Sequence, residues 1–80
     1  MTIGHYVRAL RHERSMTQAQ LAYKAGLSVA TVKRIENGWH IPNEGTIFKL
    51  ARAFNVDQRE LLTVRERTII DELESKAASA

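Results

Sequence analysis

The 80-residue chain contains no cysteine, only one proline and no long uninterrupted apolar run. Without cysteine it can form neither a disulfide nor a thiolate metal site. No stretch approaches the roughly 20 consecutive apolar residues that cross a bilayer, and the first residues include no apolar signal core. We therefore expect one small cytoplasmic domain without contact with a membrane.

Residues that usually carry catalysis are equally scarce. His5 and His12 are seven residues apart and can share a helix face, but with His40 they do not make a metal-ligand spacing. The sequence has no phosphate-cradling glycine loop and no pairing of a nucleophile with a base. We expect no enzymatic activity, no metal and no cofactor.

Charge is unevenly distributed along the chain. Residues 1–56 have eight basic and three acidic side chains, a net of +5, whereas residues 57–80 have four basic and six acidic, a net of −2. A polyanion-binding domain requires such a basic excess. Many soluble domains also carry one, so the charge alone decides little.

The stretch TQAQLAYKAGLSVATVKRIENG, residues 17–38, is the most informative part of the sequence. It predicts two short helices, over about 18–25 and 29–37, with Gly26 supplying the left-handed residue of a tight turn. A turn this short makes the helices cross steeply. The capping residues are Thr17 with Gln20 for the first helix, and Ser28 for the second.

The apolar residues of this stretch predict which side of each helix is buried. Leu21, Ala25, Val32 and Ile35 form the inner stripes, Leu27 fills the turn, and Ala22 lies where the two backbones approach most closely. The outer face of the second helix is small at its N-terminal end and basic in its middle, which suits the major groove of DNA. Its residues are Ser28, Val29, Ala30, Lys33, Arg34 and Asn37.

The pattern TQ-x-x-LA, the spacing of Ala22 and Gly26, and the closing IENG resemble the helix-turn-helix of the lambdoid phage repressor and Cro family. PNEGTIFKLARAF, residues 42–54, resembles the fourth helix of that family. The resemblance covers about two-thirds of the chain. It implies an all-α, five-helix repressor-like DNA-binding domain, which we place over residues 1–62. It also implies that Arg11 pairs with Glu36; the alternative is that both are solvated surface charges.

Local signals predict the remaining helices. The first begins at Thr2 or Gly4 and reaches about Arg14. The fourth is capped by Asn43 and ends at Asn55. The fifth is expected to begin with a capping box formed by Asp57 and Glu60.

Residues 63–80 are predicted to form a C-terminal helical extension, with ion pairs from Arg67 to Asp71 and from Glu72 to Lys76. An isolated helix of this length is marginal in water, so its apolar side needs a partner surface. We favour a second copy of the chain, because the globule is expected to be complete by about Leu62. A frayed C-terminus is the alternative. The predicted dimerisation residues are Leu62, Ile69, Ile70 and Leu73, with Ala77 on the same side.

Base reading is expected from the helix over residues 29–37 and from its cap, Ser28. Arg34 can donate two hydrogen bonds to a guanine, and Lys33 can do the same less rigidly or contact a phosphate. Val29 and Ala30 can only contact a thymine methyl or exclude a base by shape. The family often has polar residues at these two positions, so we expect fewer direct hydrogen bonds to the outer bases.

Contacts with the DNA backbone are expected at the helix ends. The resemblance places Gln18, beside Thr17, near one phosphate and Asn37 near a second. The family usually has Lys or Arg in the following loop, where this chain has Trp39 and His40. Trp39 either packs on a sugar and donates to a phosphate or anchors a core or a dimer. His40 is either an ordinary exposed imidazole or a phosphate contact.

These features predict a sequence-specific transcriptional regulator of the repressor or restriction–modification controller type. A domain this small reads few base pairs, so we expect a homodimer on a near-palindromic double-stranded operator. The alternative is an antitoxin that binds a partner toxin and regulates its own operon. A protein partner, whether a toxin or a polymerase, cannot be identified from the sequence.

Overall fold

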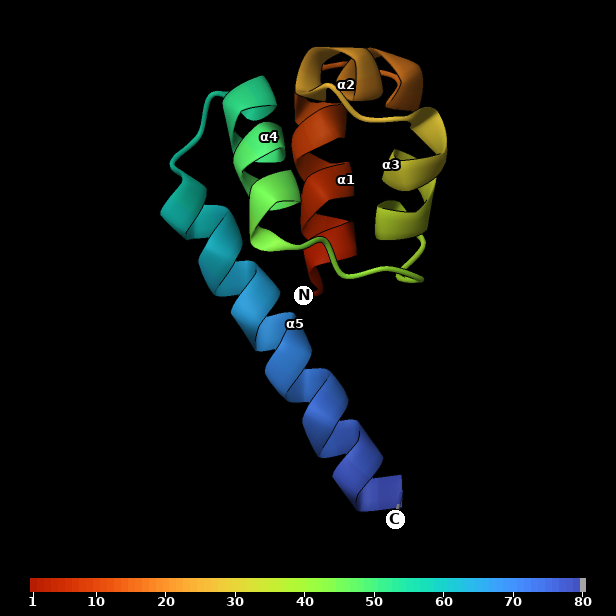
Figure 1. Ribbon diagram of the computed structural model, residues 1–80, viewed down its shortest axis with the longest axis vertical. Helices are drawn as coiled ribbons and strands as arrows, with labels where there is room; N and C mark the ends of the chain where they lie inside the picture. The colour runs from red at the N-terminus through yellow and green to blue at the C-terminus, as the bar shows by residue number, and fades with distance from the viewer. Residues whose placement is uncertain (80) are drawn as a thin grey trace.

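The computed structural model of the protein describes residues 1–79, which contain five helices and no strand. The predicted all-α fold is therefore confirmed over this range. None of these helices is long and apolar enough to span a membrane. The elements are α1 (Ile3–Glu13), α2 (Gln18–Ala25), α3 (Val29–Glu36), α4 (Glu44–Phe54) and α5 (Gln58–Ser79) (Figure 1).

The first four helices begin where the sequence predicts, because each has a capping side chain. At Thr17 both bonds of the capping box form: Gln20 N donates to Thr17 Oγ1 at 3.0 Å, and Thr17 N donates to Gln20 Oε1 at 2.8 Å. Left-handed residues end two of these helices, Gly26 at φ 70° and Asn55 at φ 57°. The other three caps are Thr2, Ser28 and Asn43.

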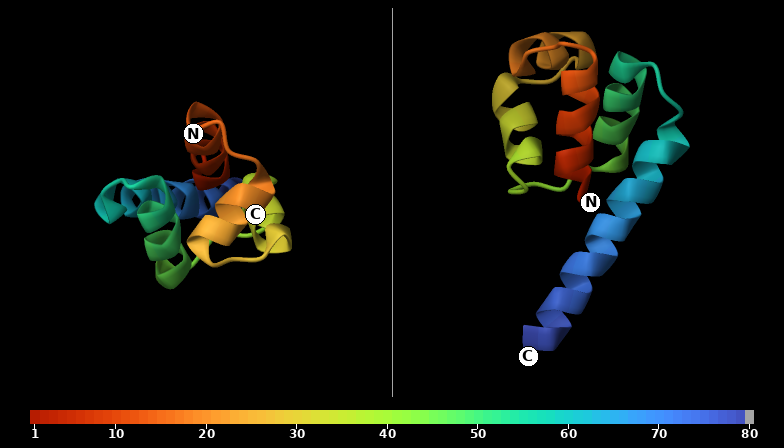
Figure 2. Two further views of the ribbon diagram at one scale, coloured as in Figure 1. Left: turned by 90° about the horizontal axis from the view of Figure 1, so that it is seen from above. Right: turned by 180° about the vertical axis from the view of Figure 1, so that it is seen from behind.

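Helix α1 is central, with α3 on one side and α4 on the other, while α2 lies across the top of the bundle (Figures 1 and 2). A Cβ atom on Gly4 would clash with the carbonyl oxygen of Ile35, so the closest approach of α1 to α3 requires glycine. Each helix turns its apolar stripe into one core. Its fully buried members include Val7, Leu21, Val32, Ile35, Ile47, Leu50, Phe54 and Leu61.

Helix α5 runs without interruption through the expected boundary at Leu62, and its contacts with the globule continue to Thr68. The amide of Ile3 donates to Thr68 Oγ1 at 2.8 Å, and Arg65 Nε donates to the carbonyl of Pro42 at 2.6 Å. The expectation that the globule is complete by Leu62 is therefore wrong. Polar side chains make these two hydrogen bonds, so a prediction based on the apolar stripe of the helix could not reveal them. Beyond this point α5 projects away from the bundle (Figure 1).

The capping box expected at the start of α5 is also wrong. Asp57 does cap the helix, since its Oδ1 accepts from the amide of Arg59 at 2.9 Å. The carboxylate of Glu60, however, accepts from the hydroxyl of Tyr6 on α1 at 2.6 Å. This hydrogen bond, together with partial burial, raises the pKa of Tyr6 to about 12. The carboxylate of Glu60 thus bonds to a residue distant in the sequence and not to the neighbouring backbone amide that a capping box requires.

Of the two ion pairs expected along the extension, only one forms. Arg67 Nε lies 3.4 Å from Asp71 Oδ1. In the described part of the chain Glu72 and Lys76 do not come within ion-pair distance of each other. Exposed pairs of this kind contribute little to stability, so the helix does not depend on either.

Candidate nucleic-acid interface

The outer face of α3 is open to solvent along its length. Lys33, Arg34 and Ala30 are exposed, and 37% of Val29 is accessible. The opposite face is buried, with Val32 and Ile35 in the core. The residues predicted to read bases are therefore all exposed, on a helix that lies at the outer side of the bundle (Figure 2).

The hydroxyl of Ser28 is engaged in starting α3. It accepts from the amide of Thr31 at 3.0 Å and lies 2.8 Å from Thr31 Oγ1. These bonds fix the rotamer of Ser28 at the N-terminal end of the exposed face. Because its hydroxyl already has these two partners, Ser28 has limited capacity left to form a hydrogen bond with a base.

A tight turn ends α3 and begins the loop that carries Trp39 and His40. Gly38 has a φ of 78°, its amide donates to the carbonyl of Ile35 at 3.1 Å, and the amide of Trp39 donates to that of Arg34 at 2.9 Å. These two backbone N–H groups are therefore used within the chain. Trp39 itself is 80% exposed, which rules out a core anchor. His40 is exposed beside it.

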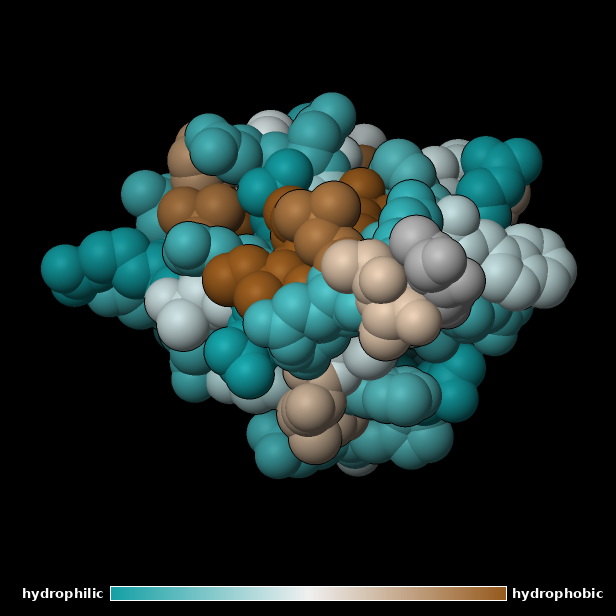
Figure 3. Space-filling view, turned by 90° about the horizontal axis from the view of Figure 1, so that it is seen from below, coloured by the Kyte–Doolittle hydropathy of each residue, from teal (hydrophilic) through white to brown (hydrophobic). Residues whose placement is uncertain are grey.

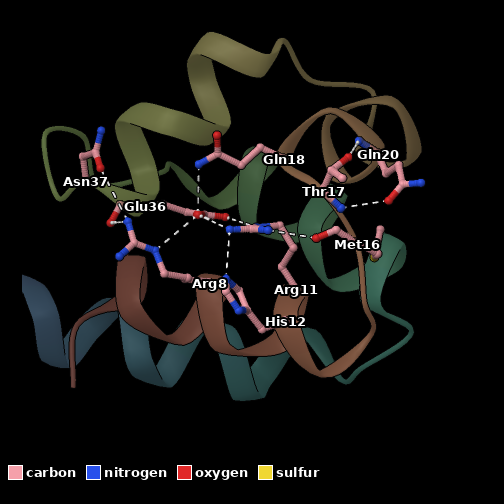
Figure 4. Close-up of polar contacts among 9 residues, drawn as sticks. All are labelled: Arg8, Arg11, His12, Met16, Thr17, Gln18, Gln20, Glu36 and Asn37. Atoms are coloured by element: carbon pink, nitrogen blue, oxygen red, sulfur yellow. Dashed lines mark hydrogen bonds and ion pairs between the residues drawn. The ribbon is translucent and has the colours of Figure 1, made fainter.

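A buried carboxylate joins the C-terminal end of α3 to α1 and α2 (Figure 4). Glu36 has a fully buried side chain. Its Oε2 accepts from Arg11 Nε at 2.7 Å, and its Oε1 accepts from Arg11 Nη2 at 2.9 Å. The expected pairing of Arg11 with Glu36 is confirmed, and the alternative of two solvated charges is wrong.

The charge of Glu36 is stabilised by the groups around it. Burial alone would raise the pKa of this carboxyl, but the hydrogen bonds from Arg11, Gln18 and Arg8 lower it below its ordinary value. The same hydrogen bond raises the pKa of Arg11. The carboxylate is therefore ionised at neutral pH, and α3 is tied to its neighbours by charge-assisted bonds.

Arg8 is a member of this cluster that the sequence reasoning missed. Its Nε donates to Glu36 Oε1 at 3.4 Å, and its Nη2 donates to the carbonyl of Glu36 at 3.4 Å and to Asn37 Oδ1 at 3.5 Å. Two arginines thus surround one carboxylate, which leaves a net positive charge. The side chain of Arg8 is 43% exposed. The available signal was its spacing, three residues before Arg11 on one helix face.

Gln18 turns its amide nitrogen inward, where Nε2 donates to Glu36 Oε1 at 3.1 Å. The sequence predicted that this amide would bond to a phosphate. In the structure it bonds to Glu36. The unpaired backbone N–H groups of the first turn of α2 remain the donors at this end. Thr17 lies on one side of the Glu36 cluster and Asn37 on the other, while the side chain of Gln18 reaches into it (Figure 4).

The residues predicted for dimerisation lie along α5, and the first of them, Leu62, packs against the core. Leu62 and Ile69 are half-buried, whereas 36% of Ile70 and 60% of Leu73 are exposed. Hydrophobic surface gathers at the centre of the underside of the molecule, from which α5 projects (Figure 3). Within residues 1–79, no group of His, Asp and Glu side chains is placed to hold a metal ion.

Comparison with known proteins identifies the family of the chain. The family model described as a helix-turn-helix domain matches residues 2–64. The chain belongs to the helix-turn-helix family. The matched region contains the whole α2–turn–α3 unit and the Glu36 cluster. The predicted resemblance to phage repressors is confirmed as well, because phage repressors are among the relatives.

Three relatives show the kind of protein involved. The chain is 44% identical over 62 residues, 76% of its length and 46% of the relative's, to the HTH-type transcriptional repressor RghR of Bacillus subtilis. It is 38% identical over 72 residues, 90% of its length and 49% of the relative's, to the immunity repressor protein of Bacillus phage phi105. It is 34% identical over 70 residues, 88% of its length and 63% of the relative's, to the cryptic phage CTXphi transcriptional repressor RstR of Vibrio cholerae. The chain spans about half the length of the first two.

Proposed function

We propose that this protein is a sequence-specific DNA-binding transcriptional regulator of the cytoplasm that acts as a homodimer on a near-palindromic operator. The observation that carries the proposal is the outer face of α3, which is exposed and basic while its inner face is locked to the bundle. The repressor relatives support the same reading. A rigid helix with a free basic face suits insertion into the major groove.

Within this proposal, base reading rests on the middle of α3. Arg34 donates two hydrogen bonds to a guanine, a contact worth about 1–3 kcal/mol of discrimination. Lys33 contacts a neighbouring base or phosphate. Val29 and Ala30 contact a thymine methyl or exclude bases by shape, and Ser28 lies at the same end of the helix. Specificity should therefore be concentrated at few base pairs in each half-site.

Contacts with the DNA backbone are proposed on both sides of the Glu36 cluster. Asn37 Oδ1 is held by Arg8, so the amide nitrogen of Asn37 is directed away from the cluster and can donate to a phosphate. The exposed part of the Arg8 guanidinium supplies charge at the same place. At the other end the first turn of α2, with Thr17 and Gln18, faces a second phosphate. Trp39 and His40 border the same strand.

Replacing Arg8 by methionine tests this backbone contact. If Arg8 approaches a phosphate, the slope of the logarithm of the affinity against the logarithm of salt concentration should fall by about one. Lys49→Met, on the exposed side of α4, is the matched control and should leave the slope unchanged. A lower melting temperature with an unaltered slope would limit Arg8 to supporting Glu36.

The proposed function itself is tested by selecting DNA sites from a random pool with the purified chain at two salt concentrations. We expect one near-palindromic consensus at both concentrations, with an affinity that falls steeply as salt rises. Half-sites should be about 34–36 Å apart, one helical turn of DNA. Recovery of no enriched sequence at either concentration would refute the assignment.

A further inference from the structure

One side of α5 carries residues in a regular order that contacts with the globule explain only at Leu62, which packs against the core. Five of them recur at alternating steps of four and three, which places them in a single line along the helix. This is the spacing with which one helix packs along another. The line, which we name the α5 seam, consists of Leu62, Glu66, Ile69, Leu73 and Lys76.

The seam flanks the inward face of α5 and becomes more exposed toward the C-terminal end of the helix. The inward face of α5 is occupied, since Leu61 is buried and Thr68 is only 5% exposed. Along the seam, Leu62 packs against the core and Ile69 is half-buried, whereas Leu73 is 60% exposed. A shallow groove runs beside the seam where α5 passes the beginning of α4. Its lining residues are Glu44, Leu62, Arg65, Glu66, Ile69 and Ile70.

We propose that a second copy of this chain lays its α5 antiparallel along the α5 seam, with the two-fold axis at Asp71. Glu66 and Lys76 lie five residues on either side of Asp71, and Ile69 and Leu73 lie two residues on either side. The axis therefore pairs Glu66 with Lys76 of the partner subunit, and Ile69 with Leu73 of the partner subunit. Lys76 of the partner subunit then lies beside the groove next to α4.

Charge determines the direction of the two helices. In a parallel pair Glu66 would face Glu66 of the partner subunit and Lys76 would face Lys76 of the partner subunit, so like charges would meet within the seam. The antiparallel pair brings opposite charges together at both ends. Glu44, in the wall of the groove, adds a second acidic group close to the incoming lysine.

The residue at the axis does not disturb this arrangement. Asp71 is two positions from both Ile69 and Leu73, so it points to the opposite side of the helix. There it pairs with Arg67 at 3.4 Å. The two copies of Asp71 therefore do not meet. This register rests on the proposed dimeric regulator and adds to it the geometry that sets the two α3 helices apart.

Charge reversal tests the register by sedimentation equilibrium of the full chain at low salt. Glu66→Lys and Lys76→Glu should each weaken dimerisation about tenfold, because each creates two like-charged contacts. The double variant should return close to the parent value. An equimolar mixture of the two single variants should form a heterodimer, since both cross-pairs are then of opposite charge.

Glu74→Lys is the matched control, because it makes the same charge change on the exposed side of α5 outside the seam. It should leave the dimer unchanged, and circular dichroism should show equal helix content in every variant. A monomeric parent, a double variant as weak as the single ones, or equal weakening by Glu74→Lys would overturn the register. If such a parent still bound its selected DNA, the regulator assignment would stand without it.

Discussion

The bundle formed by α1–α4 and the projecting half of α5 use charged residues in opposite ways. In the bundle Glu36 is fully buried, and two arginines and a glutamine donate to it. On α5 the pair of Arg67 and Asp71 is mostly exposed, at 66% and 52%. The first arrangement costs much to break and fixes α3, whereas the second costs little and leaves the helix surface free for a partner.

The largest effect that separates the two regions is expected from removing one arginine from each. Arg11→Met leaves a buried carboxylate without its main partner and should lower the free energy of unfolding by about 3 kcal/mol or more. Arg67→Met, its counterpart on α5, should change it by less than about 0.5 kcal/mol. Urea unfolding followed by circular dichroism measures both. Equal losses would show that the two regions do not differ.

A smaller effect is expected when the apolar surface of α5 is made acidic. Ile69→Asp combined with Leu73→Asp should weaken dimerisation about tenfold while the bundle stays folded, because the core is built from other residues. Sedimentation equilibrium measures the association, and thermal unfolding of the same samples provides the control. An unchanged dimer would remove this part of α5 from the interface.

The smallest effect is a dependence of stability on acidity that comes from Glu36 in the bundle. The pKa of Glu36 is lower in the folded chain than the ordinary value of 4.5. Its contribution to stability is therefore complete above pH 4.5 and is lost as pH falls through the folded pKa. Urea unfolding at a series of acid pH values measures this loss. Glu36→Gln should flatten the curve, and a curve as steep as that of the parent would contradict this role of Glu36.

Helix boundaries could be predicted closely because their signals are local. Thr17 and Gln20 make their box within one turn, and Gly26 and Asn55 adopt the left-handed conformation that short loops require. Contacts between distant residues could not be predicted in this way. Nothing near Glu60 in the sequence indicates that its carboxylate accepts from the hydroxyl of Tyr6 and not from the backbone amide of Asp57.

The candidate site was predictable to a similar extent. The exposed face of α3 followed from helical periodicity, since Val32 and Ile35 define the opposite side. The inward turn of Gln18 and the recruitment of Arg8 depend on Glu36 being buried. Burial of a charge is a property of the assembled bundle, and neither periodicity nor capping reports it.

The account depends above all on Arg34 reading a base from the outer face of α3. Site selection with Arg34→Ala and with Arg52→Ala, an exposed arginine of α4, tests this most directly. We predict that Arg34→Ala loses its preference at one base pair in each half-site, a change of about 1–3 kcal/mol, and that Arg52→Ala keeps every preference of the parent. The same base preferences for Arg34→Ala as for the parent would contradict the account.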